Sequence, residues 1–325
     1  MCEVIVCGAI NLDINLFISR FPDVGEEVQV KRLTRIPGGK GANVAVATSR
    51  ILSKDEVAIF GGLGDDVIGR EQIETLAREG VETSALKTVE GVESGQAYIT
   101  IDERGQNMIH TLFGANLEFT PADIMEESRR LLIENSKIVI VIDPRPDSLL
   151  SLARLGDSLG KTVIFDPGVR STLGLSGLRN VLTSVDYVVL NSVEIENVTG
   201  KKDPIEAFEE LKSQGLACNL IAKYGADGCV MVGAESGEVF SIAGIDLHSL
   251  GLKVVNTVGA GDAFLGVFAA FKSLGFSDYD CLVKANVAGA FKVTQSVTRG
   301  SPMKKELEVF MSQIGFENSE IYRGN

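Results

Sequence analysis

The chain has 325 residues, 45% of them hydrophobic, which is enough for one or two domains with a large buried core. Its 44 acidic residues outnumber its 31 basic residues and give a formal net charge of -13, which repels nucleic acid, and no run of Lys and Arg exceeds two. Its apolar runs have the length of strands and not that of a membrane span. We therefore expect neither a nucleic acid nor a membrane as a partner.

The N-terminal segment enters a strand-like run, Val4–Cys7, without the basic and long apolar regions of a secretory signal. The five cysteines form no Cys-x-x-Cys pair, and their odd number argues against a disulfide framework. We therefore expect a cytoplasmic protein with reduced, buried thiols. The cysteines are Cys2, Cys7, Cys218, Cys229 and Cys281.

An apolar strand, a glycine-rich turn and a segment of helical period alternate along the chain. The clearest example runs from Ala58–Phe60 through Gly61–Asp66 to a helix over Ile68–Glu79. Strands of the same apolar character follow at Thr162–Phe165, Tyr187–Leu190 and Asn219–Ala222. Such strands are typical of a sheet that is covered on both faces. The fold class is therefore α/β, with a mostly parallel sheet sandwiched by helices in three layers.

Two segments break this rhythm with the alternating pattern of half-buried strands. Val28–Arg35 alternates apolar and polar residues, and Gln96–Leu112 predicts a hairpin around a turn at Glu103–Gln106. We interpret these segments as a small antiparallel β lid.

The lid is expected to be inserted at about residues 12–36 and 92–113. No long linker or internal repeat divides the chain, so residues 1–325 should form a single domain that carries the lid. The tail, Gly315–Asn325, is interpreted as a surface extension.

The strongest chemical signal is Gly259-Ala260-Gly261-Asp262. A strand from Lys253 is expected to lead into it, and a helix with an apolar face from Phe264 to Leu274 should follow. Small residues let a ligand approach the backbone, and the unpaired N–H groups of a helix start attract an anion. Asp262, in the first turn, could take a proton from a hydroxyl beside that anion. A tight turn followed by a helix-favouring acid is the alternative.

The second signal is Pro37-Gly38-Gly39-Lys40-Gly41-Ala42-Asn43, which precedes a helix through Leu52. Its glycines bring the backbone and one cation close to a polar ligand, and Asn43 offers a donor and an acceptor to a hydroxyl. The spacing is not that of a Walker A loop. By itself the segment fits a glycine-rich helix entry equally well.

Together the two segments resemble the ribokinase-like (PfkB) family of sugar and nucleoside kinases, and within it ribokinase most. That family carries a GG-x-G-x-N motif and then a GAGD motif, matched here by Gly38–Asn43 and Gly259–Asp262. Further matches are Asn11–Asp13, Gly61–Asp66 with Gly69, Asn191–Glu194 and Lys223–Gly228. The resemblance covers about residues 3–300 and implies a ribokinase-like fold, Rossmann-like in its layers.

The resemblance implies that Asp262 is the catalytic base, while the backbone of Gly259, Ala260 and Gly261 neutralises charge on the transferring phosphoryl group. It also implies that Asn191 and Glu194 help to hold Mg²⁺, through water. Phosphoryl transfer depends mostly on positioning and charge neutralisation, which agrees with this assignment. A capped helix start is the alternative for the Asn191–Glu194 pair.

The resemblance further divides the site into a nucleotide side and a sugar side. ATP is the expected phosphoryl donor, and ADP is not excluded. On the nucleotide side it places Asn191, Lys223, Gly225, Gly228, Gly259, Gly261 and Asn286, with Asn286 near the adenine. On the sugar side it places Asp13, Gly38, Gly39, Lys40 and Asn43, where a carboxylate and an amide would grip vicinal hydroxyls.

The sequence departs from the family at three places. Position 256 is Asn where a carboxylate commonly helps to bind a monovalent cation, which leaves activation by potassium open. Val44-Ala45 replaces the usual Gln-Ala of ribokinases. Phe165–Arg170 is similar to a segment of keto-deoxy-sugar-acid kinases, with Gly168 in place of Asn. Arg170 could bind a substrate carboxylate or phosphate, or form a structural ion pair.

The leading hypothesis is ATP- and Mg²⁺-dependent phosphorylation of a primary hydroxyl of a small sugar, with ribose as the first choice. A nucleoside, ribose 1-phosphate and 2-keto-3-deoxygluconate are the other candidates. For base stacking the lid offers only Phe17, Tyr98 and Phe113. A non-catalytic sugar or nucleotide sensor is the alternative from another class. Apolar lid faces also favour a homodimer formed through the lids.

Overall fold

The computed structural model describes residues 2–143, 145–235 and 237–315. The tail that was interpreted as a surface extension lies outside these residues from position 316 on. All five cysteines are buried and unpaired, as expected. No helix among the described residues combines the length and the apolar character that a membrane span requires.

The body is built on one sheet of eight strands, in the order β14-β13-β12-β11-β10-β9-β1-β4. Six neighbouring strands run parallel, from β12 to β4, whereas β13 is antiparallel to β12 and β14 is antiparallel to β13. The mostly parallel sheet expected from the apolar strands is therefore confirmed. The strands are β1 (Val4–Cys7), β4 (Val57–Phe60), β9 (Ile138–Ile142), β10 (Thr162–Asp166), β11 (Tyr187–Asn191), β12 (Asn219–Lys223), β13 (Gly228–Val232) and β14 (Val239–Ala243).

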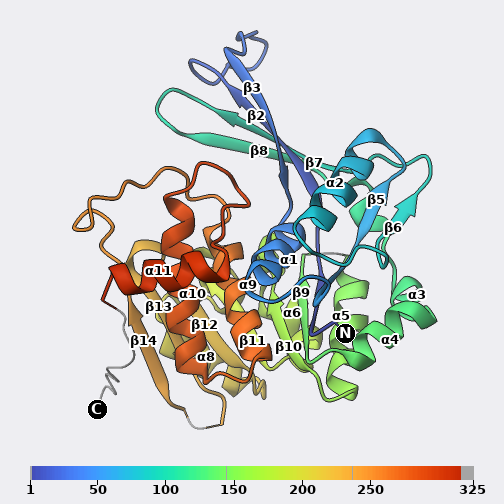
Figure 1. The fold of residues 1–325 in the computed structure, drawn as a ribbon, viewed down its shortest axis with the longest axis vertical. Helices are drawn as coiled ribbons and strands as arrows, with labels where there is room; N and C mark the ends of the chain where they lie inside the picture. Colours follow the sequence, from blue (N-terminus) through green and yellow to red (C-terminus); the bar gives the residue numbers. More distant parts are fainter. Residues whose placement is uncertain (1, 144, 236, 316–325) are drawn as a thin grey trace.

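Helices cover both faces of this sheet and complete three layers (Figure 1). Alternate strand residues face opposite cores, so that Val4 and Val6 join one apolar cluster while Ile5 and Cys7 join the other. The first cluster contains α1 (Lys40–Ile51), α9 (Ala260–Ser273) and α10 (Asp278–Val293), with α11 (Lys304–Gln313) against α10. The second contains α5 (Pro146–Ser158), α6 (Gly174–Leu182), α7 (Ser192–Thr199) and α8 (Pro204–Ser213).

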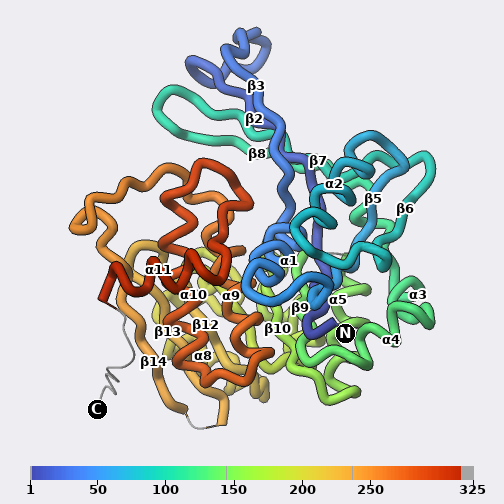
Figure 2. The backbone as a smooth tube through the Cα atoms, viewed as in Figure 1, coloured from blue at the N-terminus to red at the C-terminus, as the bar shows by residue number. Residues whose placement is uncertain are grey.

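The lid is a sheet of four strands, in the order β3-β2-β7-β8, that projects from the body (Figure 2). The pairs β2–β3 and β7–β8 are antiparallel, and β2 and β7 run parallel between them. The strand predicted at Val28–Arg35 corresponds to β3, which begins only at Arg32. The prediction is therefore wrong for residues 28–31. The strands are β2 (Asn11–Phe17), β3 (Arg32–Gly38), β7 (Gly95–Ile101) and β8 (Asn107–Leu112).

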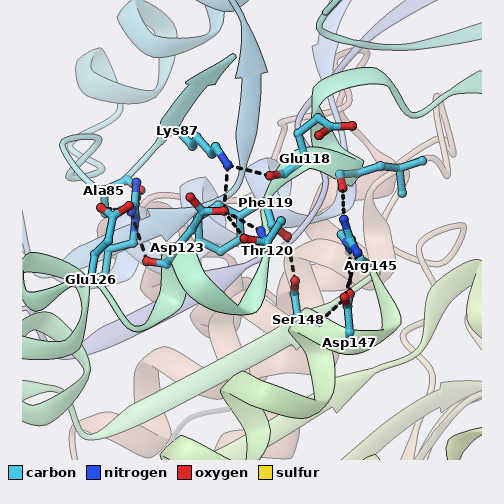
Figure 3. A network of polar contacts seen from close by, with 12 residues as sticks. Ala85, Lys87, Glu118, Phe119, Thr120, Asp123, Glu126, Arg145, Asp147 and Ser148 are labelled. Atoms are coloured by element: carbon cyan, nitrogen blue, oxygen red, sulfur yellow. Dashed lines mark hydrogen bonds and ion pairs between the residues drawn. The ribbon is translucent and has the colours of Figure 1, made fainter. Parts of the chain in front are cut away.

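A polar network anchors the segment that follows the lid to the body (Figure 3). Lys87, in β6 (Lys87–Val89), donates to Glu118 O and to Asp123 Oδ2, both at 2.9 Å. Ser148 Oγ on α5 donates to Phe119 O at 2.7 Å. These bonds fix the segment that follows β8 to the body. The neighbouring short elements are β5 (Gly62–Gly64), η1 (Gly114–Glu118), α2 (Val67–Arg78), α3 (Pro121–Ile124) and α4 (Glu127–Asn135).

The strand predicted to run from Lys253 into the glycine turn is wrong. Residues 252–256 have no regular structure, and Val254 and Val255 are exposed. The N–H groups of Val255 and Asn256 both donate to Val293 O at the end of α10 rather than to a neighbouring strand. The segment therefore reaches α9 as a loop that is fixed to a helix end.

The close approach of α9 to α1 depends on Gly266. A Cβ atom at this position would lie 2.6 Å from Ala47 Cβ and 2.8 Å from Val44 O on α1. We expect Gly266→Ala to lower the free energy of unfolding by about 1–3 kcal/mol because it overpacks this contact. In an exposed helix the same change would raise that free energy by about 1 kcal/mol.

Urea unfolding measures this effect, and Gly289→Ala is the matched control. A Cβ atom at Gly289 on α10 would meet only Ala260 O, at an ordinary 3.5 Å. The control should unfold at the same or a higher urea concentration than the wild type. A Gly266→Ala protein as stable as the wild type would contradict the packing described.

Candidate active site

The site is organised by the first turn of α9. Gly259 has φ +87°, and a Cβ atom there would lie 2.5 Å from Thr298 O, so only glycine fits this turn. Within the described residues the N–H groups of Gly261 and Asp262 have no backbone acceptor, as expected for a helix start. The positive end of the helix therefore faces outward and can receive an anion, as the sequence predicted.

Asp262 follows these N–H groups and is held from the other half of the chain. Its Oδ2 accepts a hydrogen bond from Asn43 Nδ2 on α1 at 2.8 Å. Burial raises the pKa of Asp262 above its ordinary value, while Lys40 and the bond from Asn43 oppose that rise. Asn43 was predicted to bind sugar hydroxyls. Its amide nitrogen instead donates to the predicted base, Asp262.

Arg299 fixes the other side of that amide, and sequence reasoning missed it. Its Nε donates to Asn43 Oδ1 at 3.3 Å, and its Nη2 donates to Gly38 O at 3.0 Å and to Gln72 Oε1 at 2.8 Å. The side chain is buried, and its Nη1 has no partner among the described residues. A lone arginine in a loop carries no spacing signal, so the sequence alone offered nothing to identify it.

Asp13 lies beside this group, near the start of the lid strand β2. A Cβ atom at Gly38 would lie 2.2 Å from Asp13 Oδ2, so the carboxylate needs a glycine there. Burial raises the pKa of Asp13 to about 6, Arg299 opposes the rise, and Asp262 adds to it. The structure therefore brings together four residues of the predicted site: Asp13, Gly38, Asn43 and Asp262.

A second polar cluster lies at the carboxyl ends of β10, β11 and β12. Lys40 Nζ is 3.1 Å from Asp166 Oδ1 and 3.6 Å from Glu194 Oε1. Lys223 Nζ is 3.4 Å from Asp166 Oδ2. Burial alone would raise the pKa of Asp166, but Lys40 and Lys223 hold it below its ordinary value. The resemblance assigned Lys40 to the sugar side. In the structure it forms ion pairs with Asp166 and Glu194, which were not among the predicted sugar-side residues.

The residues expected to hold Mg²⁺ form a capping box at the start of α7. Asn191 Oδ1 accepts from the N–H groups of Val193 and Glu194, and Glu194 Oε2 accepts from Asn191 N at 2.8 Å. Among the described residues no three His, Cys, Asp or Glu side chains are grouped so that they could ligate a metal directly. The buried carboxylates of Asp166 and Glu194 fit a hydrated magnesium ion, because that ion keeps several waters and prefers oxygen ligands.

A cavity of about 620 Å³ opens next to the α9 turn. Lys223, Gly225, Gly228, Gly261 and Asn286, all predicted on the nucleotide side, line it, whereas Asn191 and Gly259 are absent from its described lining. Its wall is otherwise mostly apolar, with Ile245, Leu247, Val254, Phe264 and Val293. A flat base and a polyphosphate fit such a cavity, which has an apolar wall and a charged end. His248 also lines it.

Arg170 faces Asp143. Its Nε is 3.9 Å from Asp143 Oδ1, and its guanidinium stands 5.6 Å from the ring centre of Phe113. Burial raises the pKa of Asp143 to about 7, against the effect of Lys40 and Arg170. The structural ion pair, which was the alternative for Arg170, is therefore present, and a contact with substrate remains a prediction.

The family model of the pfkB family carbohydrate kinases matches residues 1–305. The chain belongs to this family. It is therefore a phosphotransferase that acts on a hydroxyl of a sugar or nucleoside, as the ordered pair of glycine motifs predicted. The ribokinase-like resemblance and fold class are confirmed.

Several curated relatives of this pfkB protein act on different pentose substrates. Ribokinase of Arabidopsis thaliana is 30% identical over 296 residues, which cover 89% of this chain and 75% of the relative. An ATP-dependent ribose-1-phosphate kinase of Halopiger xanaduensis is 28% identical and covers 96% and 99% of the two chains. A deoxyribokinase of Salmonella typhimurium is 26% identical and covers 95% and 99%.

Solved structures agree with the fold of this pfkB protein. The Arabidopsis thaliana ribokinase complexed with ribose and ATP superposes with a TM-score of 0.85 at 26% identity, over 96% of this chain and 99% of that one. A Methanocaldococcus jannaschii nucleoside kinase, 19% identical, shares the fold with a TM-score of 0.79 over 96% and 99% of the two chains.

The raised pKa of Asp13 gives the stability of this pfkB protein a pH dependence. The folded carboxyl group keeps its proton up to about pH 6, whereas in the unfolded chain it loses the proton near its ordinary value of about 4. The folded state therefore binds the extra proton, and the contribution of Asp13 to the free energy of unfolding falls by up to about 3 kcal/mol as pH rises from 4 to 6.

Urea unfolding between pH 4 and 8 measures this dependence. The stability of Asp13→Asn relative to the wild type should increase from pH 4 to 6 and stay constant above. The control Glu74→Gln removes an exposed carboxylate from α2 and should run parallel to the wild type. Parallel curves for Asp13→Asn and the wild type would show that Asp13 has no raised pKa.

Proposed function

We propose that the protein transfers the γ-phosphoryl group of ATP, with Mg²⁺, to the primary hydroxyl of a small sugar, with ribose as the first candidate. The observation that carries this proposal is the position of Asp262. It follows the unpaired N–H groups of α9, which begins beside the cavity with the apolar wall, and it is bonded to Asn43 of the sugar-side group. A proton acceptor, an anion site and two binding regions therefore meet at one residue.

In the proposed reaction Asp262 takes the proton of the attacking hydroxyl while that oxygen bonds to the γ-phosphorus. The bond from the γ-phosphorus to the bridging oxygen breaks, and ADP leaves. The N–H groups of Gly261 and Asp262 stabilise charge on the transferring group. Lys223, at the charged end of the cavity, adds a cation. Magnesium, held through water by Asp166 and Glu194, would neutralise phosphate charge.

The strand register removes Tyr98 as a stacking partner for a nucleoside base. Tyr98 on β7 pairs in register with Ile14 on β2, so both side chains leave the same face of the lid. Asp13 leaves the opposite face because side chains alternate along a strand. A base bound beside Asp13 could therefore not stack on Tyr98. The Arabidopsis thaliana ribokinase solved with ribose and ATP supports ribose as the first substrate to test.

A sugar 1-phosphate is the second candidate, because Arg299 offers a charged donor near Asp13. Its Nη1 is buried without a partner among the described residues, and its charge acts on the pKa of Asp13. A phosphate oxygen is a strong acceptor for such a group. The Halopiger xanaduensis relative named for ribose 1-phosphate makes this substrate worth a direct test.

Asp262→Asn tests the mechanism, because the amide keeps the shape of the side chain and cannot take the proton. We expect kcat for sugar phosphorylation to fall by about 10²–10⁴-fold, with the affinity for ATP retained. A coupled assay for ADP, run over ribose, deoxyribose, ribose 1-phosphate, fructose, 2-keto-3-deoxygluconate and nucleosides, gives the rates. The same panel with ADP as the donor tests the alternative nucleotide.

The control for this variant is Asp280→Asn, which removes a first-turn carboxylate from α10 in an exposed position. It should keep kcat within about twofold. Activity of Asp262→Asn within tenfold of the wild type would exclude the assigned base. Ligand binding by the wild type with no turnover across the panel would favour the sensor.

The outer face of the lid supports a homodimer. Tyr98, Met108 and Leu112 share this face by register, and all three are exposed, as is Leu33. A second lid would cover this apolar surface, and closure of the lids over the sugar would exclude water from the reaction. We expect Met108→Glu to shift the protein from dimer to monomer in sedimentation velocity.

Val309→Glu is the control for this change, because Val309 is as exposed as Met108 but lies on α11 of the body. It should leave the sedimentation coefficient unchanged. A wild type that sediments as a monomer at all concentrations would contradict the lid dimer.

A further inference from the structure

Lys292 is a fully buried lysine beneath the loop that leads into the active site. Its exposed fraction is 0%, and it lies in the last turn of α10. Its Nζ donates to Asn256 O at 2.8 Å, the one hydrogen bond of this ammonium among the described residues. Burying an ammonium costs free energy unless the charge is paired and hydrogen-bonded, so the position of Lys292 needs an explanation.

Helix α10 packs against α9 (Figure 1), and the bond of Lys292 to Asn256 O places its ammonium beside the loop that leads into α9. Gly289 lies one turn before Lys292 and faces Ala260 O, the carbonyl of the first residue of α9. Burial lowers the pKa of Lys292 to about 8, and Asp262 opposes that decrease. The ammonium is therefore largely charged at neutral pH and interacts electrostatically with the proposed base.

The bond to Asn256 also orients the peptide group that follows. In a trans peptide the C=O and the next N–H point in opposite directions. Because Asn256 O points to Lys292, the N–H of Thr257 points away from it, and Thr257 lines the nucleotide cavity. The ammonium polarises this peptide and thereby strengthens its N–H as a donor.

The side chain of Asn256 is occupied at both ends. Its Oδ1 accepts from Val258 N at 3.0 Å, and its Nδ2 donates to Ser296 O at 3.1 Å. The loop before Gly259 is thus held by two neutral hydrogen bonds of the Asn256 side chain and by one hydrogen bond from the ammonium of Lys292. The loop therefore already has the positive charge of Lys292 beside it. Position 256 has no carboxylate that would attract a second cation.

We propose that Lys292 is a positioning residue for phosphoryl transfer, whose fixed ammonium supplies beneath the Asn256–Gly261 loop the positive charge that a bound monovalent cation would otherwise supply. The inference rests on the proposed kinase function. Its consequence is that the wild-type rate does not depend on the kind of monovalent cation in solution.

The first test measures the wild type in potassium, sodium and tetramethylammonium chloride at equal ionic strength. We expect kcat values within about twofold of one another. The second test compares Lys292→Met with Lys292→Ala. Methionine fills the space without charge and should lower kcat at least tenfold, whereas alanine leaves room for an ion. Potassium or ammonium should therefore raise the rate of Lys292→Ala at least fivefold and leave Lys292→Met unchanged.

Calorimetric binding separates this inference from the kinase proposal. Lys292→Met should bind ATP about tenfold more weakly than the wild type and adenosine within twofold, because only ATP carries the charge that the loop receives. This readout holds even if no sugar in the panel is phosphorylated, an outcome that would reject the proposed function instead.

Lys284→Met is the control, since Lys284 lies on the same helix but packs on Phe271 and Phe276. It should match the wild type in all assays. Thermal unfolding checks that each variant folds. If Lys292→Met does not fold, Lys292→Arg, which keeps the charge, should still turn over independently of potassium. A wild type activated more than fivefold by potassium, or a folded Lys292→Met with wild-type kcat and ATP affinity, would overturn the inference.

Discussion

The hydrogen bond from Asn43 to Asp262 joins two residues that are 219 positions apart, and the site depends on it. Asn43 lies on α1, which follows the lid strand β3 directly, and Asp262 lies on α9, which begins at the nucleotide cavity. Gly266 on α9 lets the two helices approach closely. One contact thus connects the part of the chain that carries the lid with the part that surrounds the nucleotide.

Charged side chains of both signs surround this contact. The chain has a net charge of -13, yet Lys40, Lys223, Lys292 and Arg299 all lie around the site. Each of these cations has a carboxylate, a carbonyl or an amide oxygen as a partner, which offsets its loss of hydration. Lys223 lines the nucleotide cavity and places one cation where a polyanionic nucleotide would bind.

Much of the fold and part of the site could be predicted from the sequence, because those features are encoded locally. Apolar strands between glycine turns indicated the parallel sheet, and the Gly259–Asp262 motif indicated a helix start that receives an anion. Arg299 and Lys292 could not be predicted, since their roles arise from tertiary packing between segments far apart in the chain. The strand expected at Lys253 failed for the same reason: Val293 O on α10 takes the N–H groups that a sheet would have used.

The most direct test of the account is a double-mutant cycle on kcat with Asn43→Ala and Asp262→Asn. If Asn43 acts by holding the catalytic base, its removal should lower kcat at least tenfold in the wild-type background and less than twofold in Asp262→Asn. Urea unfolding of all four proteins would verify that each is folded at the assay temperature. Equal losses in the two backgrounds would show that Asn43 and Asp262 act independently, which would contradict the central role assigned to their contact.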